Sequence, residues 1–288
     1  MRICPDCGAP LDEHWKCHVC CRDIEILDGY FAFAPALAQS STGFKREYFI
    51  ELAALEEKNF WFRSRNKLIV WALRSYFPDT ASFLEIGCGT GYVLAGIKEA
   101  FPEIQLYGSE VYTAGLGFAA MRAGNATLFQ MDAREIPFKD EFDVIGAFDV
   151  LEHIDEDERV LQQLYRAVRP GGGIILTVPQ HPFLWSQQDK AACHVRRYRK
   201  HELKKKVEAA GLKVKMTASF VSLLFPFMLL SRLCRRVSEE HYDPMIELRL
   251  GSVANPVLEG IMSLERVLTQ WGVRFPLGGS LLLVAEKP

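Results

Sequence analysis

Short apolar runs recur along the middle of this chain, and segments with a helical pattern lie between them. The apolar runs cover residues 83–86, 104–108, 126–130, 142–148, 174–178 and 212–218. Helices are predicted at 92–100, which Pro102 follows, and at 201–210, which Gly211 ends. Strands that alternate with helices predict an α/β fold with a doubly wound, mostly parallel sheet. In such sheets ligands bind beyond the carboxyl ends of the strands.

The first of these strands runs into a loop with three alternate glycines. Gly87, Gly89 and Gly91 are spaced G-x-G-x-G, whereas dinucleotide-binding loops have G-x-G-x-x-G. The acid before the first glycine, Glu85, would repel a pyrophosphate but could receive the cationic amino-acid end of S-adenosylmethionine, directly or through water. The glycines alone would also fit an ordinary strand–turn–helix connection, so motifs elsewhere in the chain are needed to distinguish the two interpretations.

Acidic residues follow the next strands at corresponding places. Glu110 ends the second strand, where a carboxylate can accept hydrogen bonds from both ribose hydroxyls. Asp132 follows the third strand, Asp149 follows the fourth within 149–154, and the segment 169–173 precedes the fifth.

In this order, these motifs resemble those of the class I S-adenosylmethionine-dependent methyltransferases, over residues 83–178. The resemblance implies a seven-stranded sheet whose last strand, 279–285, lies antiparallel beside the fifth. It also implies that Asp132 accepts a hydrogen bond from the adenine amino group. The full set of cofactor-binding residues expected in this part of the chain is Glu85, Gly87, Cys88, Gly89, Gly91, Glu110, Val111, Asp132, Ala133 and Asp149.

Composition agrees with an enzyme of this kind. With 288 residues and 49% hydrophobic content, the chain can bury one full α/β core and a small extra module. A net charge of −2 argues against a broad polyanion-binding surface. No signal-peptide pattern opens the sequence, so a cytoplasmic location is expected, with cysteines as thiols or metal ligands.

Four cysteines near the N-terminus form two C-x-x-C pairs. Cys4, Cys7, Cys17 and Cys20 can present four thiolates to one structural Zn²⁺, which predicts a zinc ribbon over residues 1–33. The segment resembles the zinc-ribbon activator proteins that partner tRNA and release-factor methyltransferases, which implies docking on a catalytic domain. Nucleic-acid binding by the ribbon is the less favoured alternative, because it holds few cations.

A linker is predicted at 34–43 because it is rich in Ala, Ser and Pro, and the methyltransferase domain would then span 44–288. The domain would begin with largely helical sequence up to residue 76. In many small-molecule methyltransferases a helix at this place lies across the cofactor pocket, so the resemblance makes Trp61 and Arg65 further cofactor-binding residues. The alternative is that the aromatic residues pack this helix on the domain and the arginines face solvent.

The segment 180–200 is predicted to form the wall of the acceptor pocket, because it leaves the carboxyl edge of the sheet. Transfer to a hydroxyl or amine needs a group that removes the acceptor proton, and His194 is the first choice, followed by His181 and Tyr198. Arg196 and Arg197 could hold an anionic group of the substrate. Methyl transfer can also proceed mainly by positioning, without a base.

The segment 220–236 combines an apolar run with the cationic residues Arg232, Arg235 and Arg236. It is too short to span a bilayer, which takes about 20 residues. A buried or subunit-interface helix, a lid over an apolar substrate and an in-plane membrane contact all remain open.

Together these observations predict a methyltransferase that acts on a small-molecule, lipid-linked or glycan acceptor. Three rivals remain: an rRNA or tRNA methyltransferase that binds RNA through the ribbon, a non-catalytic cofactor- or RNA-binding protein, and a nicotinamide oxidoreductase, against which the glycine spacing argues. The acceptor and the oligomeric state do not follow from the sequence.

Overall fold

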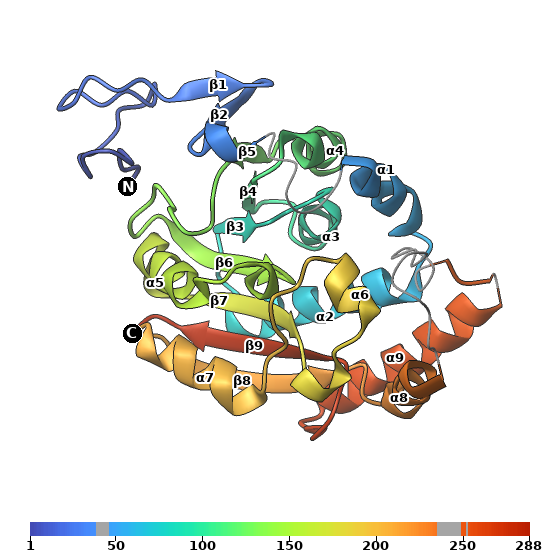
Figure 1. Ribbon diagram of the computed structural model, residues 1–288. Coiled ribbons are helices and arrows are strands. Elements are labelled where there is room, and N and C mark those ends of the chain that lie inside the picture. The colour runs from blue at the N-terminus through green and yellow to red at the C-terminus, as the bar shows by residue number, and fades with distance from the viewer. Residues whose placement is uncertain (39–45, 235–248, 252) are drawn as a thin grey trace.

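A computed structural model describes residues 1–38, 46–234 and 249–288 except 252. These residues form one nine-stranded sheet with the order β1-β2-β5-β4-β3-β6-β7-β9-β8 (Figure 1). The strands are β1 (Glu25–Leu27), β2 (Tyr30–Ala32), β3 (Ser82–Ile86), β4 (Gln105–Glu110), β5 (Thr127–Gln130), β6 (Phe142–Phe148), β7 (Val168–Pro179), β8 (Lys213–Phe220) and β9 (Ser280–Glu286). Strands β3 to β7 are parallel to their neighbours among themselves, and β9 lies antiparallel between β7 and β8. The predicted seven-stranded doubly wound sheet with an antiparallel last strand is therefore confirmed.

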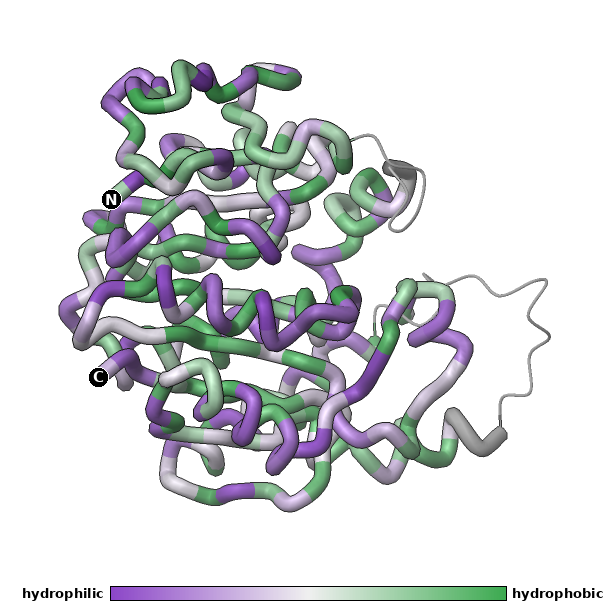
Figure 2. Tube along the Cα trace, turned by 60° about the vertical axis from the view of Figure 1, so that its left-hand side comes forward, coloured by the Kyte–Doolittle hydropathy of each residue, from purple (hydrophilic) through white to green (hydrophobic). Residues whose placement is uncertain are grey.

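Helices cover both faces of this sheet. Their bounds are α1 (Arg46–Leu55), α2 (Phe60–Tyr76), α3 (Tyr92–Ala100), α4 (Thr113–Ala123), α5 (Asp157–Ala167), α6 (Gln187–Ala191), α7 (Lys200–Ala209), α8 (Phe225–Cys234) and α9 (Ala254–Gln270). One apolar core joins α5 and α7 to the sheet, and a second joins α2, α3, α4 and α9 to its other face. The central strands are mainly hydrophobic, while hydrophilic residues gather on the surrounding helices and loops (Figure 2). Because both faces are buried, the strands form continuous apolar runs.

An ion-pair cluster fastens α9 to α2. Arg63 donates to Glu259 Oε2 through Nε at 3.0 Å and through Nη2 at 2.6 Å, and Lys67 donates to Oε1 of the same carboxylate at 2.8 Å. The Arg63 guanidinium, followed by Lys67, holds the pKa of Glu259 below its ordinary value. The helix that leads into β3 is thus held by a segment near the other end of the chain.

The N-terminal module extends the catalytic sheet. Strand β2 pairs parallel with β5 and antiparallel with β1. Trp15, which is 5% exposed, packs edge-on against Phe129 of β5 with ring centroids 5.3 Å apart, and against Phe138 at 6.0 Å. The backbone of Ile3 also donates to the carbonyl of Pro137 at 2.9 Å. Module and core therefore share a sheet and one apolar cluster.

Two predicted segments are described only in part. Of the linker predicted at 34–43, residues 39–43 lie outside the described residues, while Pro35–Leu37 forms a 3₁₀ turn. In the apolar segment 220–236, Arg235 and Arg236 likewise lie outside the described residues, and α8 carries the exposed Phe227 and Leu230. Within the ranges described, no helix has the length and apolar character needed to cross a membrane.

Candidate functional site

A cavity of about 600 Å³ opens beyond the carboxyl ends of β3, β4, β5 and β6. Its lining includes the acidic residue expected at or just beyond the end of each of these strands: Glu85, Glu110, Asp132 and Asp149. The sequence-predicted residues that line it together are Trp61, Arg65, Glu85, Gly87, Cys88, Gly89, Glu110, Val111, Asp132, Ala133 and Asp149. Gly91 is the expected cofactor residue that does not line it.

Glycines in the loop after β3 differ in what surrounds them, as Gly89 and Gly91 show. All have positive φ, at +66° for Gly87, +52° for Gly89 and +76° for Gly91, which side chains other than glycine adopt at a cost. A Cβ on Gly91 would lie 2.6 Å from the Cα of Ala119 in α4, so this glycine allows two helices to pack closely. A Cβ on Gly89 would meet nothing within 4 Å. Gly89 thus leaves open space in the cavity wall, where a ligand can approach the backbone.

Glu85 is a buried acid with an unused oxygen. Its side chain lies on β3, and Oε2 accepts no hydrogen bond from the described residues. Burial raises the pKa of Glu85 well above its ordinary value, although Arg65 acts in the opposite direction. A buried carboxylate oxygen without a partner is costly, so a cationic donor in the cavity would be stabilised here.

Arg65 connects the helix α2 to the loop after β6. Its guanidinium forms an ion pair with Asp149, and its Cζ lies 4.5 Å from the ring centroid of Trp61. Arg65 is 9% exposed, so it is not the solvated arginine of the alternative interpretation. Helix α2 therefore places both a cation and an aromatic ring at the cavity.

Glu110 and Asp132 are held in fixed positions by donors of the protein. The backbone N–H of Gly89 donates to Glu110 Oε2 at 3.1 Å, and that of Val111 donates to Oε1 at 2.8 Å. Arg134 donates through Nε to Asp132 Oδ2 at 2.9 Å, and its own backbone N–H donates to Oδ1 at 2.9 Å. Glu110 Oε2 accepts from Gly89 and can take a second hydrogen bond from a ligand. Both oxygens of Asp132 already accept from Arg134, so a ligand donor would share this carboxylate with the guanidinium.

Two features at the cavity do not follow from the sequence motifs. Glu56, beyond the end of α1, accepts a hydrogen bond of 2.5 Å from the Thr90 hydroxyl and pairs with Arg122 of α4. Arg122 also donates to the Thr90 hydroxyl at 2.8 Å. Arg134 closes another part of the wall. Glu56 and Arg122 lie far apart in the chain, so no local sequence pattern indicates that they pair.

The residues present fit S-adenosylmethionine, the cofactor that the resemblance implies. The unpartnered Glu85 oxygen suits its ammonium group, the open face of Gly89 leaves room for it, and Glu110 and Asp132 can accept from hydroxyl and amino groups. This donor set contains no cluster of cations for a pyrophosphate.

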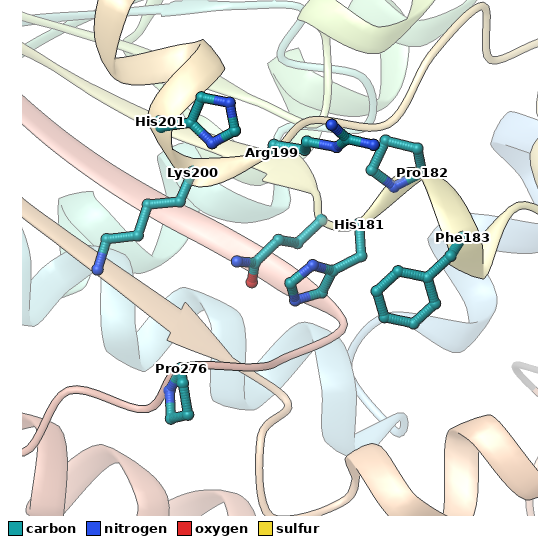
Figure 3. Close-up of a pocket in the computed structure, with 8 residues that line it drawn as sticks. His181, Pro182, Phe183, Arg199, Lys200, His201 and Pro276 are labelled. Atoms are coloured by element: carbon teal, nitrogen blue, oxygen red, sulfur yellow. The ribbon is translucent and has the colours of Figure 1, made fainter.

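The three residues expected to act as a base lie outside the lining of this cavity. Tyr198 is fully buried and donates to Asp157 Oδ2 at 2.7 Å. His181 lines a smaller cavity of about 300 Å³, in which its ring lies beside that of Phe183 (Figure 3). His194 lies nearer, because its ring centroid is 4.8 Å from that of His153, which does line the large cavity.

The segment 180–200 contributes to both cavities, and Arg196 and Arg197 are paired with carboxylates of the protein. Cys193 lines the large cavity, and His181, Pro182 and Phe183 line the small one. Arg197 donates through Nε to Asp189 Oδ1 at 2.7 Å, and Arg196 Nη1 lies 2.8 Å from Asp157 Oδ2. These guanidinium groups neutralise carboxylates of the protein.

The four N-terminal cysteines meet in one cluster. The sulfur atoms of Cys4 and Cys20 lie 3.6 Å apart, those of Cys7 and Cys17 lie 3.4 Å apart, and all four lie within 4.8 Å of one another. Four sulfurs bound tetrahedrally to Zn²⁺ at about 2.3 Å would be about 3.8 Å apart. The backbone N–H of Cys20 is the largest influence that lowers the pKa of Cys17 to about 6. The geometry is compatible with a zinc ribbon, and the neighbouring Cys21 is outside the cluster.

Comparison with known proteins agrees with this geometry. A family model described as a methyltransferase domain matches residues 56–216, which is more than half of the chain. A probable S-adenosylmethionine-dependent methyltransferase of Mycolicibacterium smegmatis is 25% identical over 169 residues, which cover 58% of this chain and 64% of the relative. The 27-O-demethylrifamycin SV methyltransferase of Amycolatopsis mediterranei is 29% identical over 169 residues, which cover 53% of this chain and 57% of the relative. The matches thus span less than two thirds of either relative.

A solved structure supports the fold. The complex between the Haloferax volcanii Trm112 methyltransferase activator and a putative methyltransferase contains a chain that aligns with a TM-score of 0.55 and 17% identity. The alignment covers 84% of this chain and 97% of that chain. At this identity the likeness concerns the architecture alone.

Proposed function

The chain belongs to the methyltransferase domain family of S-adenosylmethionine-dependent methyltransferases, and from that premise we propose that it methylates a small-molecule, lipid-linked or glycan acceptor. The relative from Amycolatopsis mediterranei is named for a rifamycin-type substrate, which supports an acceptor outside the nucleic acids. A net charge of −2 also disfavours a broad RNA-binding surface.

The observation that carries the proposal is the buried, unpartnered oxygen of Glu85 in a cavity that four strand ends surround. An ammonium group bound there would satisfy the carboxyl group and would favour its charged form. The sulfonium donor supplies an activated methyl group when it is bound.

The protein's own residues would fix the donor from several sides. Glu110 would accept from ribose hydroxyls and Asp132 from the adenine amino group, while Arg65 and Trp61 of α2 would close the cavity over the amino-acid end. Rigid carboxylates reduce the entropy lost on binding, because backbone and arginine donors already hold them. Catalysis would then depend mainly on alignment of the acceptor with the methyl group.

For the N-terminal module, residues 1–33, we propose a structural Zn²⁺ bound by Cys4, Cys7, Cys17 and Cys20. The ion would supply folding free energy to a segment with a small core. The module would act as an intramolecular docking unit, since β2 continues the catalytic sheet. The catalytic domain would follow from about residue 44, after the linker.

Calorimetry with S-adenosylhomocysteine tests the cofactor site. We expect binding to the wild-type protein and an affinity at least tenfold lower for Glu85→Gln and for Asp132→Asn, because each change removes a charge-assisted hydrogen bond, worth about 1.5–3 kcal/mol. Glu103→Gln is the matched control, since Glu103 is an exposed acid just before β4, at the opposite edge of the sheet. Absence of binding heat in the wild type would contradict the proposal.

The acceptor requires a separate experiment. Small-molecule and lipid fractions from the source cells are incubated with the protein and the donor, and release of S-adenosylhomocysteine is followed. Release with these fractions supports the proposed acceptor class. Release only with a tRNA or rRNA fraction would refute it.

A further inference from the structure

Three side chains with metal-binding atoms meet beside the large cavity, away from the cysteine cluster. Glu152 and His153 belong to the 3₁₀ turn Leu151–His153 after β6, and His194 follows α6. One carboxylate oxygen and one ring nitrogen of each histidine lie within 4.8 Å of one another. His153 lines the cavity. Small side-chain rotations would bring the three atoms around one ion.

Glu152 carries the strongest indication of a bound cation. The residue is 0% exposed, and both carboxylate oxygens are buried without a hydrogen-bond partner among the described residues. The arginines that act on it, Arg65 and Arg197, are each paired with another carboxylate, Asp149 and Asp189 respectively. Neither of these arginines is therefore free to neutralise Glu152, and a bound cation would satisfy both oxygens.

His194 is oriented as a metal ligand requires. Its Nδ1 lies 2.9 Å from Oδ1 of Asp189, a fully buried carboxylate that also accepts from Arg197. In the tautomer that donates from Nδ1, Nε2 keeps its lone pair. A carboxylate that fixes the ring and tautomer of a histidine ligand is a recurrent second partner in metal sites.

We propose that Glu152, His153 and His194 bind one divalent first-row transition-metal ion, and that this ion holds the oxygen atom of the methyl acceptor. Two imidazoles and one carboxylate suit such ions better than Mg²⁺ or Ca²⁺, which prefer oxygen ligands. Three protein ligands leave coordination positions open for a substrate oxygen. The acceptor would accordingly be a hydroxyl compound. This inference rests on the proposed methyltransferase function.

The ion would replace a general base in the transfer. Coordination lowers the pKa of the acceptor hydroxyl, whose proton leaves to water. The oxygen then forms the new O–C bond while the C–S bond of the donor breaks, and the electron pair of that bond remains on sulfur. In this arrangement His194 holds the ion and does not itself remove the proton.

Cobalt spectroscopy on the full-length, zinc-containing protein tests the site. Co²⁺ is added after dialysis against a chelator that spares the cysteine cluster. We expect weak visible d–d bands that saturate at a single added equivalent, without the thiolate charge-transfer bands that exchange into the cysteine cluster would give. In Glu152→Gln and in His194→Ala the affinity for Co²⁺ should fall at least tenfold. No d–d bands in the wild type would overturn the proposal.

Two controls separate the alternatives. His201→Ala removes an exposed histidine of α7 and should leave Co²⁺ binding unchanged. Glutamine has nearly the shape of glutamate, so Glu152→Gln should bind Co²⁺ like the wild type if Glu152 is only a packing group, which would refute its role. Urea unfolding of each variant without metal confirms that the fold is intact.

The remaining measurements isolate the acceptor role. Acetohydroxamate, a small oxygen ligand, should shift the d–d bands, and an unchanged spectrum would show a closed site that cannot hold an acceptor. Calorimetry with S-adenosylhomocysteine is run on the same samples. Cofactor binding without Co²⁺ binding would refute the metal site alone. Co²⁺ binding without cofactor binding would refute the methyltransferase proposal and, with it, the acceptor role of the ion, while the metal site itself would stand.

Discussion

Replacing Gly89 or Gly91 by alanine separates the ligand-binding role of the loop from its packing role. Both residues have positive φ, so each substitution should cost about 1–2 kcal/mol in backbone strain. At Gly91 the new methyl group would also lie 2.6 Å from the Cα of Ala119, and overpacking of this kind costs about 1–3 kcal/mol more. We therefore expect a loss of about 2–5 kcal/mol for Gly91→Ala and about 1–2 kcal/mol for Gly89→Ala.

The effect on ligand binding should have the opposite order. Gly89 lines the cavity, and the methyl group of Gly89→Ala would lie in open space, with no protein atom within 4 Å beyond its chain neighbours. If a ligand occupies that space, a steric cost of about 1–3 kcal/mol would weaken its binding about 5- to 150-fold. Gly91 does not line the cavity, so its variant should lose less affinity than stability.

The assays are urea unfolding for the free energy and calorimetry with S-adenosylhomocysteine for the affinity. Wild-type affinity in Gly89→Ala would refute the assignment of the loop to the cofactor. If Gly91→Ala were no less stable than Gly89→Ala, the packing argument would be wrong.

The remaining predictions concern the ion-pair cluster, the cysteine cluster and the contact of Trp15 with the catalytic domain. Glu259→Gln should cost about 1 kcal/mol at pH 7, and because pairing with Arg63 lowers the pKa of this acid, the difference from wild type should vanish as the pH falls below about 4 in urea unfolding. Metal analysis should find zinc lost from Cys20→Ser and retained in Cys21→Ser, and equal zinc in both would contradict the assigned ligands. Trp15→Ala should lower the free energy of unfolding by about 3–5 kcal/mol, whereas a loss below about 1 kcal/mol would show that the N-terminal module docks weakly.

The central strands followed from the sequence because their apolar runs are short and clearly bounded. Strand β6 begins and ends at the predicted residues, but β7 starts at Val168, six residues before the predicted start. The difference lies in the glycine-rich start of β7. A Cβ on Gly172 would lie 2.3 Å from the carbonyl oxygen of Asp143, and one on Gly173 would lie 2.2 Å from that of Ala285. Neighbouring backbone lies so close to these positions that only glycine fits, and the strand continues through them. The local sequence pattern does not contain this information, because the neighbours come from distant parts of the chain.

In the functional site, too, some features follow from the local sequence, whereas others are contacts between segments that are far apart in the chain. Acids at strand ends were predictable, since each follows its own apolar run and parallel strands bring their ends together. The pairing of Glu56 with Arg122 and the meeting of Glu152 with His194 join elements that are far apart in the chain. Such contacts arise from packing of helices against the sheet, so they required the structure.

The shared sheet gives the N-terminal module a physical route to the cavity. Gln130, the last residue of β5, is fully buried and pairs in register with Ala32 of β2. Its side-chain amide donates to the carbonyls of Ala34 at 2.8 Å and Val111 at 2.9 Å, and Val111 lines the cavity. Asp132 follows two residues later. The Gln130 amide therefore links Ala34, just beyond the N-terminal module, to the ends of β4 and β5. For this reason, ordering of the cysteine cluster should also stabilise the part of the cavity assigned to adenine and ribose.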